Sequence, residues 1–238
     1  MSEMHGVSVL LVEDDAVLRA EVARNLVGHG YRVIEAGDAE DALRRWHDVR
    51  PDLVLLDLGL PDLDGIAVLR QMRRESSTGV IVLSARGEET SKVQALEGGA
   101  DDYLTKPFGM PELHARMRSV LRRAAGPAAD VDGVVRNGTI ALDVGAHEVR
   151  VAGLPVALTP REFAIFQVLL SHPGRLVTRG RILRAVWGEA YRGEDHYVHV
   201  YVSQIRRKLA AVDAERSLDD LIIAEPGVGY RVRAPTAG

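Results

Sequence analysis

Four side chains that can take part in phosphoryl transfer close short apolar segments of this chain. Glu13 and Asp14 follow the first such segment. Asp57 ends the second, and Lys106 ends a third. Short apolar runs between turn residues are typical of buried parallel strands, whose carboxyl ends share one edge of a sheet. We therefore expect these four side chains to meet at that edge.

Such a cluster suits one kind of chemistry. Neighbouring carboxylates repel each other unless a hard cation lies among them, and Mg²⁺ prefers one or two carboxylates with waters and a phosphate. A carboxylate can act as the nucleophile that takes up a phosphoryl group, while a lysine and the metal stabilise the transferred charge. The hydroxyl of Ser84, which ends a fourth apolar run, can hydrogen-bond the new group. The sequence therefore predicts a Mg²⁺-dependent site at which a carboxylate can take up a phosphoryl group.

A simpler interpretation is that each acid is a solvated loop charge or a helix cap. We favour this interpretation for Asp15, because it directly precedes the helical pattern 16–28. It is weak for Asp14, Asp57 and Lys106 together, because all three share strand-end positions.

The first half of the chain alternates short apolar runs with amphipathic stretches of helical length, which is typical of βαβ units. We expect an α/β fold, a doubly wound five-stranded parallel sheet of the flavodoxin-like type. Its strands are expected near 7–12, 32–36, 53–57, 80–84 and 102–105. Its helices are expected near 16–28, 39–49, 65–75, 88–97 and 109–123.

The second half has a different pattern. Strand-like runs near 139–142, 148–151 and 156–158 precede helices near 160–171, 178–187 and 195–211, and two further strands follow near 221–225 and 230–233. Thr159 and Glu162 are spaced as a capping box, with Pro160 at the first helical position. This order predicts an α+β winged helix-turn-helix domain.

The helix near 195–211 has two faces. Val198, Val202, Ile205 and Leu209 form an apolar stripe. We expect the opposite face to be exposed and to enter a DNA major groove, with Gln204 able to read an adenine edge and the cations placed on phosphates. A solvated face without a partner is one alternative, and packing of Tyr197 and Tyr201 on the neighbouring loop is another. The expected DNA-binding residues are His196, Tyr197, Val200, Tyr201, Ser203, Gln204, Arg206, Arg207 and Lys208, with Arg231 from the final strand.

Composition limits the location and the partners. The absence of cysteine excludes disulfides and fits a reducing cytosol. No apolar run approaches the ~20 residues that span a bilayer, and residues 1–5 do not resemble a signal peptide. We expect a cytoplasmic protein that makes no membrane contact.

Residues 124–132 are small and polar and contain Pro and Gly, so we expect a linker between domains 1–123 and 133–238. Residues 1–123 hold 16 Lys and Arg against 21 Asp and Glu, a net charge of −5, and the rest hold 14 against 13, a net of +1. The second domain is therefore not strongly basic, and any nucleic-acid patch on it must be local.

Residues 7–123 resemble the receiver domain of two-component response regulators. The matching motifs are Val12-Glu13-Asp14, Leu56-Asp57-Leu58, Pro61-Asp62, Asp64-Gly65, Leu83-Ser84-Ala85-Arg86 and the run from Gly99 to Phe108. The resemblance implies that Asp57 accepts a phosphoryl group from a sensor histidine kinase. It implies that Glu13, Asp14, Asp57 and the Gly59 carbonyl hold Mg²⁺, and that Lys106 contacts the phosphoryl group. It also implies that Ser84 and Tyr103 form a switch pair and that the Lys106–Pro107 peptide is cis.

The second domain resembles the winged-helix effector domain of the OmpR/PhoB family. The matching motifs are Leu158-Thr159-Pro160-Arg161-Glu162-Phe163, Val177-Thr178-Arg179, Ala185-Val186-Trp187-Gly188, Val198 to Ser203, Arg206 to Leu209 and Gly227 to Arg231. Some members carry a wing-tip arginine, where this chain has Pro226, so minor-groove reading by the wing is not expected. Asp57 to Asp62, Val82 to Arg86 and Asp195-His196-Tyr197 also resemble the regulators of potassium-transport operons within that family.

The resemblance implies a transcriptional regulator, rather than an enzyme, that binds double-stranded DNA at repeated half-sites, contacts RNA polymerase, and forms a homodimer when phosphorylated. Charge pairs across that dimer need added apolar contact, which we expect from Val93, Leu96 and Leu113. The expected dimer surface comprises Lys92, Val93, Leu96, Glu97, Asp101, Asp102, Glu112, Leu113, Arg116, Arg118 and Arg123. Two alternatives remain: a Mg²⁺-dependent aspartyl-phosphate enzyme, and a receiver whose output is a protein interaction without DNA binding.

Overall fold

The computed structural model of this chain describes residues 6–85, 89–124, 133–188, 197–213, 215 and 218–235, without the side chains of 85, 89–91 and 122–124. The chain divides into two compact units, Met1–Ala125 and Gly126–Gly238. Each unit is described by itself.

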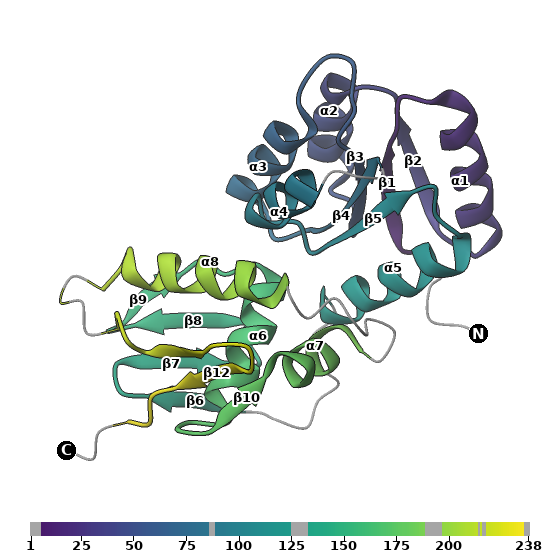
Figure 1. Cartoon of the computed structure of the whole chain (residues 1–238). Helices are drawn as coiled ribbons and strands as arrows, with labels where there is room; N and C mark the ends of the chain where they lie inside the picture. Colours follow the sequence, from purple (N-terminus) through teal and green to yellow (C-terminus); the bar gives the residue numbers. More distant parts are fainter. Residues whose placement is uncertain are drawn as a thin grey trace. The chain divides into compact units, whose positions relative to one another are not determined.

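The first unit alternates strands and helices (Figure 1). In chain order its elements are β1 (Ser8–Val12), α1 (Ala16–Gly28), β2 (Arg32–Ala36), α2 (Ala39–Val49), β3 (Leu53–Asp57), α3 (Gly65–Glu75), β4 (Gly79–Ala85), α4 (Glu89–Glu97), β5 (Asp102–Lys106) and α5 (Met110–Ala124). The strands form one parallel sheet in the order β2-β1-β3-β4-β5, which confirms the predicted doubly wound fold.

Helices cover both faces of this sheet (Figure 1). On one face, the buried side chains of α1 and α5 pack with alternate strand residues such as Leu11, Leu55 and Leu83. Every residue of β1 and β3 is buried, because a strand covered on both sides has no solvent-facing position. The sheet is therefore a rigid support whose carboxyl edge can position polar side chains.

Local signals set the helix starts beside that edge. Asp15 caps α1, and its carboxylate accepts hydrogen bonds from the backbone N–H groups of Val17 and Leu18 at 2.8 and 3.1 Å. These bonds lower the pKa of Asp15, and the cap interpretation of this residue is confirmed. At the start of α3, a Cβ on Gly65 would lie 2.6 Å from the Cα of Leu58 and 2.7 Å from the carbonyl of Asp57. A glycine is therefore required where α3 passes the end of β3.

The second unit has two antiparallel sheets and three helices among its described residues (Figure 1). Its elements are β6 (Val134–Asn137), β7 (Ile140–Asp143), β8 (Glu148–Val151), β9 (Leu154–Val156), α6 (Pro160–Leu170), β10 (Leu176–Thr178), α7 (Arg179–Trp187), α8 (Val198–Ala210), β11 (Ile222–Glu225) and β12 (Gly229–Val232). The sheets have the orders β6-β7-β8-β9 and β10-β12-β11. The predicted winged helix-turn-helix fold is confirmed, with β6 and β10 as strands that were not expected.

The hairpin formed by β11 and β12 is joined to α7 through β10. A Cβ on Gly229 would lie 2.1 Å from the Val177 carbonyl oxygen and 2.8 Å from the Cα of Thr178. Only glycine lets β12 approach β10 this closely, so Gly229 fixes the hairpin against the start of α7. In the described part of the chain, no helix is both long and apolar enough to cross a membrane.

Candidate functional site

The carboxyl edge of the parallel sheet gathers the acidic residues expected there. Asp57 ends β3, and Glu13 and Asp14 follow β1. One carboxylate oxygen from each of the three lies within 4.8 Å of the others. Glu13 and Asp57 are buried, at 1% and 6% exposure, while Asp14 is exposed. Two carboxylates of the cluster are therefore buried, and the third is accessible to solvent.

Lys106 reaches into this cluster from the end of β5. Its Nζ donates to Oδ2 of Asp57 at 2.7 Å and to Oε1 of Glu13 at 2.8 Å. Burial alone would lower the pKa of Lys106, but the hydrogen bonds to Asp57 and Glu13 outweigh it and the pKa is raised. Burial raises the pKa of Glu13, and the Asp57 charge raises it further against the hydrogen bond from Lys106. The lysine therefore stays charged and neutralises part of a carboxylate site.

Ser84 contributes a hydroxyl near the end of β4, the strand between β3 and β5. The residue is 2% exposed, and its Oγ has no hydrogen-bond partner among the residues that the structure describes. A buried hydroxyl without a partner costs about 1–3 kcal/mol, so its presence calls for an explanation. An oxygen of a phosphoryl group on Asp57 would supply the missing acceptor.

The donor set fits the expected divalent cation. Two buried carboxylates, one exposed carboxylate and an open side are what Mg²⁺ requires when it retains several waters. Asp57 also accepts a hydrogen bond at 3.2 Å from the backbone N–H of Gly59, which orients the carboxylate at the start of the loop after β3. The structure thus brings together Glu13, Asp14, Asp57 and Lys106, and the backbone N–H of Gly59 contacts Asp57. Ser84 lies near the end of β4, the strand next to β3.

Tyr103 lies on β5 and points toward the helices that flank it. Its ring is 7% exposed, with Nζ of Lys92 5.1 Å and Cζ of Arg116 5.8 Å from the ring centre. These distances are within the range of cation–π attraction. Both α4 and α5 therefore contact this residue, through one cation each.

Several residues of the expected dimer surface lie inside the domain instead. Leu96 and Leu113 are 2% and 0% exposed, and Leu113 belongs to the core under α5. The expectation that these two leucines supply apolar contact across a dimer is wrong, because they pack under their own helices. Val93 is half-buried, so it alone of the three expected apolar residues is partly available at the surface.

Two acids of the expected surface have partners within the same unit. Asp102 accepts from the Arg116 guanidinium at 2.9 Å, and both side chains are under 10% exposed. Arg116 also contacts Glu112 at 2.8 Å. An intermolecular role for Asp102 or Arg116 would require breaking this internal pair. Glu97, Glu112 and Arg118 are exposed and Lys92 is half-buried, whereas the side chain of Arg123 lies outside the described residues.

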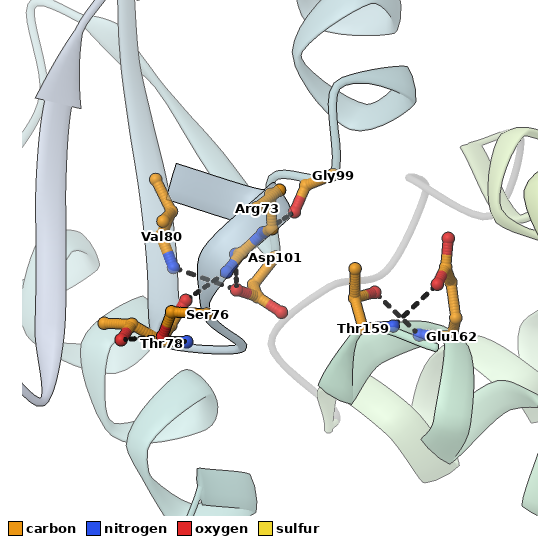
Figure 2. A network of polar contacts seen from close by, with 8 residues as sticks. All are labelled: Arg73, Ser76, Thr78, Val80, Gly99, Asp101, Thr159 and Glu162. Atoms are coloured by element: carbon orange, nitrogen blue, oxygen red, sulfur yellow. Dashed lines mark hydrogen bonds and ion pairs between the residues drawn. The ribbon is translucent and has the colours of Figure 1, made fainter. Parts of the chain in front are cut away.

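Asp101 is held by Arg73 of α3, not by a charge on the expected surface. Figure 2 shows the Arg73 guanidinium between the α4–β5 connection and the start of β4. It donates to Oδ2 of Asp101 at 2.5 Å, to the Gly99 carbonyl at 2.7 Å and to the Thr78 carbonyl. The same Asp101 oxygen accepts from the Val80 N–H at 2.9 Å. Asp101 is therefore a buried structural anchor and not a surface group.

The face of α8 expected to be exposed is largely buried. Tyr197, Val200, Tyr201 and Gln204 are 6, 3, 2 and 6% exposed, respectively. Tyr201 packs against Trp187 of α7, with ring centres 5.3 Å apart. Gln204 accepts a hydrogen bond from the Arg207 guanidinium. The expectation of exposure is therefore wrong for these four residues, because α8 packs against both α6 and α7 and buries a wider arc than one stripe.

The cations of α8 also have definite partners. Arg206 donates twice to the Ile222 carbonyl of β11, at 2.6 and 3.2 Å, and Nζ of Lys208 lies 2.6 Å from Oε2 of Glu162. Arg231 of β12 pairs with Glu225 at 3.0 Å. These contacts place Arg206 and Lys208 in the structural framework of the domain, whereas the pair of Arg231 and Glu225 lies at the surface, with side chains 41% and 39% exposed.

A narrower exposed stripe remains on α8. His199, Ser203 and Arg207 are exposed and follow one another at steps of four, so they share one helix face. His196 lies outside the described residues. His199 was not among the expected DNA-binding residues. One sequence signal points to it: if Tyr197, Val200 and Tyr201 belong to the apolar arc, His199 lies on the opposite side of the helix.

Comparisons with known proteins match each of the two units to a known domain family. Residues 9–118 match the model of the response regulator receiver domain, and residues 153–232 match that of the C-terminal domain of transcriptional regulatory proteins. The transcriptional regulatory protein KdpE of Mycobacterium tuberculosis strain H37Rv is 42% identical over 226 residues, which are 95% of this chain and 99% of the relative. The KDP operon transcriptional regulatory protein KdpE of Escherichia coli K12 is 41% identical over 94% of this chain and 98% of the relative.

Solved structures show the same arrangement of elements. A point mutant of RitR superposes with a TM-score of 0.74 at 25% identity, covering 95% of this chain and 99% of that one. The response regulator DrrB of Thermotoga maritima, described as an OmpR/PhoB homologue, has a TM-score of 0.50 at 27% identity over 98% and 100% of the two chains. All of these similarities run through both units.

Proposed function

Because this chain belongs to the OmpR/PhoB family of response regulators, we propose that a sensor histidine kinase phosphorylates Asp57 and that the phosphorylated homodimer binds promoter DNA. The chain combines a receiver domain with a DNA-binding effector domain of transcription regulators. The observation that supports Asp57 as the acceptor is its contact with Lys106 at the edge of the sheet where β4 also ends. Ser84 lies near that end of β4, and its hydroxyl has no hydrogen-bond partner among the described residues.

In the proposed reaction, a carboxylate oxygen of Asp57 attacks the phosphorus of the donor. A bond forms between that oxygen and phosphorus, the phosphorus bond to the donor breaks, and the leaving group keeps the electron pair. Glu13, Asp14, Asp57 and the Gly59 carbonyl would hold Mg²⁺, which supplies Lewis-acid stabilisation of the phosphoryl oxygens. Lys106 neutralises further charge on that group, and Ser84 donates its hydroxyl to one of its oxygens.

The new group adds a charge of about −1.5 to −2, which attracts the Ser84 hydroxyl and Lys106. Tyr103 then moves inward behind Ser84 and biases a two-state equilibrium toward the active form. In the resting arrangement Lys92 of α4 and Arg116 of α5 flank the ring. This motion therefore also changes the contacts that the two helices make with Tyr103. The proposed dimer uses the exposed residues Glu97, Glu112 and Arg118 of these helices, with the half-buried Lys92 and Val93.

We assign the regulated genes to potassium transport, by similarity of the motifs around Asp57 and Ser84 to those of KdpE proteins. The regulator acts in the cytoplasm, with RNA polymerase as its further partner. Its exposed DNA-reading stripe is His199, Ser203 and Arg207.

One selection experiment tests this function. Genomic fragments of the host are incubated with the full chain, with and without acetyl phosphate, and the bound fragments are sequenced. Enrichment of repeated half-sites upstream of potassium-transport genes, stronger after phosphorylation, is the expected result. No enrichment of any sequence would favour a protein-interaction output. Turnover of a small phosphorylated substrate by the same preparation would favour an aspartyl-phosphate enzyme.

A further inference from the structure

Two consecutive residues of α6 hold the proposed DNA-reading helix at two places. Glu162 contacts Lys208 near the carboxyl end of α8. Arg161 stacks on Trp187 with its Cζ 4.5 Å from the ring centre, and Trp187 contacts Tyr201 in the first half of α8. Because α6 packs directly against α8, these contacts relate the position of one helix to the other.

The side chain of Glu162 is only 3% exposed. Burying a carboxylate is unfavourable unless it has hydrogen-bond or charge partners. Its Oε2 accepts the N–H of Thr159 at 2.7 Å in the capping box drawn in Figure 2. The same oxygen lies 2.6 Å from Nζ of Lys208, whose side chain is 29% exposed. A buried carboxylate is tolerated when such partners satisfy it, so Lys208 compensates the buried carboxylate of Glu162.

The helix ends strengthen this pairing. Glu162 lies in the first turn of α6, where the helix dipole favours an anion. Lys208 lies in the last turn of α8, where the dipole favours a cation. The two dipoles and the ion pair therefore prefer one placement of the α8 end against the start of α6.

We infer that Lys208 is a positioning residue, held by Glu162 so that α8 presents His199, Ser203 and Arg207 correctly, and that it contributes no phosphate contact. The inference rests on the proposed DNA binding. It reverses the role that the sequence suggested, in which Lys208 was one of the cations on phosphates. The neighbouring Arg207 is exposed and remains a phosphate-contacting residue.

Salt dependence separates the two roles. Each protein–phosphate contact adds nearly one unit to the slope of log affinity against log salt concentration. The probe is the DNA duplex most enriched in the genomic selection, and a scrambled duplex of equal length is the non-specific reference. Affinities of the phosphorylated full chain are measured by fluorescence anisotropy at several salt concentrations for Lys208→Met, Glu162→Gln, the double variant and Arg207→Met.

Lys208→Met and Glu162→Gln should each weaken binding to the enriched duplex about tenfold, and the double variant no more than either alone. Their salt slopes should equal that of the unaltered protein, whereas Arg207→Met should lower the slope by about one unit. Lys208→Arg should restore affinity because it keeps the charge and reach. This rescue distinguishes positioning from general loss of structure and does not depend on the folding of Glu162→Gln.

A slope lowered by about one unit in Lys208→Met would overturn the inference and make Lys208 a phosphate contact. Additive losses in the double variant would also overturn it, because the two residues would then act separately. Failure of the unaltered protein to enrich any duplex would contradict the proposed function instead.

Discussion

Nζ of Lys106 lies 2.7 Å from Oδ2 of Asp57, although 49 positions separate the two residues in the chain. They end strands β5 and β3, which are not neighbours in the sheet because β4 lies between them. Ser84 belongs to that middle strand, opposite Thr105 of β5. A phosphoryl group on Asp57 can therefore meet groups from three adjacent strands, provided that their register is kept.

Lys106→Met should slow phosphorylation of the chain by acetyl phosphate about 100-fold, because the ammonium stabilises charge on the transferred group. The time course of intact mass measures this rate at saturating Mg²⁺. Arg70→Met is the matched control, since Arg70 is exposed on α3 and should react at the unaltered rate. Equal rates for the two variants would contradict the role of Lys106.

Glu13→Gln should raise the melting temperature of the receiver unit in metal-free buffer at pH 7. Burial raises the pKa of Glu13 above 4.5, so its ionised form disfavours folding above that raised value. The gain should shrink as the pH falls through the raised pKa and vanish below 4.5, where Glu13 is protonated in both the folded and unfolded states. Calorimetry from pH 4 to 8 measures the trend. A gain that grows toward low pH would be the wrong sign.

Asp101→Asn should destabilise the receiver unit by about 3–5 kcal/mol, because it leaves the Arg73 guanidinium buried without its anion. Urea unfolding followed by Trp46 fluorescence in a Trp187→Phe background reports on this unit alone. The matched control is Arg44→Gln, which removes an exposed pair with Asp41 and should change stability by at most ~1 kcal/mol. Similar small losses in both variants would show that the Arg73 anchor is unimportant.

Gly229→Ala should disrupt the joint between β10 and β12, because its Cβ would lie 2.1 Å from the Val177 carbonyl oxygen. We expect a lower melting temperature for the effector unit and weaker DNA binding, with phosphorylation unchanged. Gly180→Ala is the control: its Cβ would meet nothing within 4 Å, and alanine should stabilise α7 by about 0.5–1 kcal/mol. Equal melting temperatures for the two variants would rule out the close approach.

The sequence predicted the receiver fold well because β1, β3 and β4 are built on short apolar runs and distinct helix patterns separate the strands. The site residues Asp57 and Lys106 were predictable for the same reason, because the end of a strand fixes where its last side chain lies. In the second unit, β10 escaped prediction because it is only three residues long and its partner β12 lies far along the chain. β6 was missed although it pairs with the next strand, β7.

Exposure was the property that the sequence predicted least well. Periodicity identifies the most apolar stripe of α8, but it does not say how many neighbouring helices the same helix touches. Tyr201 is buried because Trp187 lies beside it, and Leu113 is buried because α5 covers the sheet. Asp101 and Lys208 looked like surface charges because their partners, Arg73 and Glu162, are 28 and 46 positions away.

Intact mass spectrometry of the unaltered chain and of Asp57→Asn, each incubated with acetyl phosphate in the presence and absence of Mg²⁺, tests the central claim most directly. We expect the unaltered chain to gain the mass of one phosphoryl group only when Mg²⁺ is present, and Asp57→Asn to gain none. Peptide mapping should place the group on Asp57. Mg²⁺-dependent phosphorylation of Asp57→Asn at the unaltered rate would contradict the assignment of Asp57 as the acceptor.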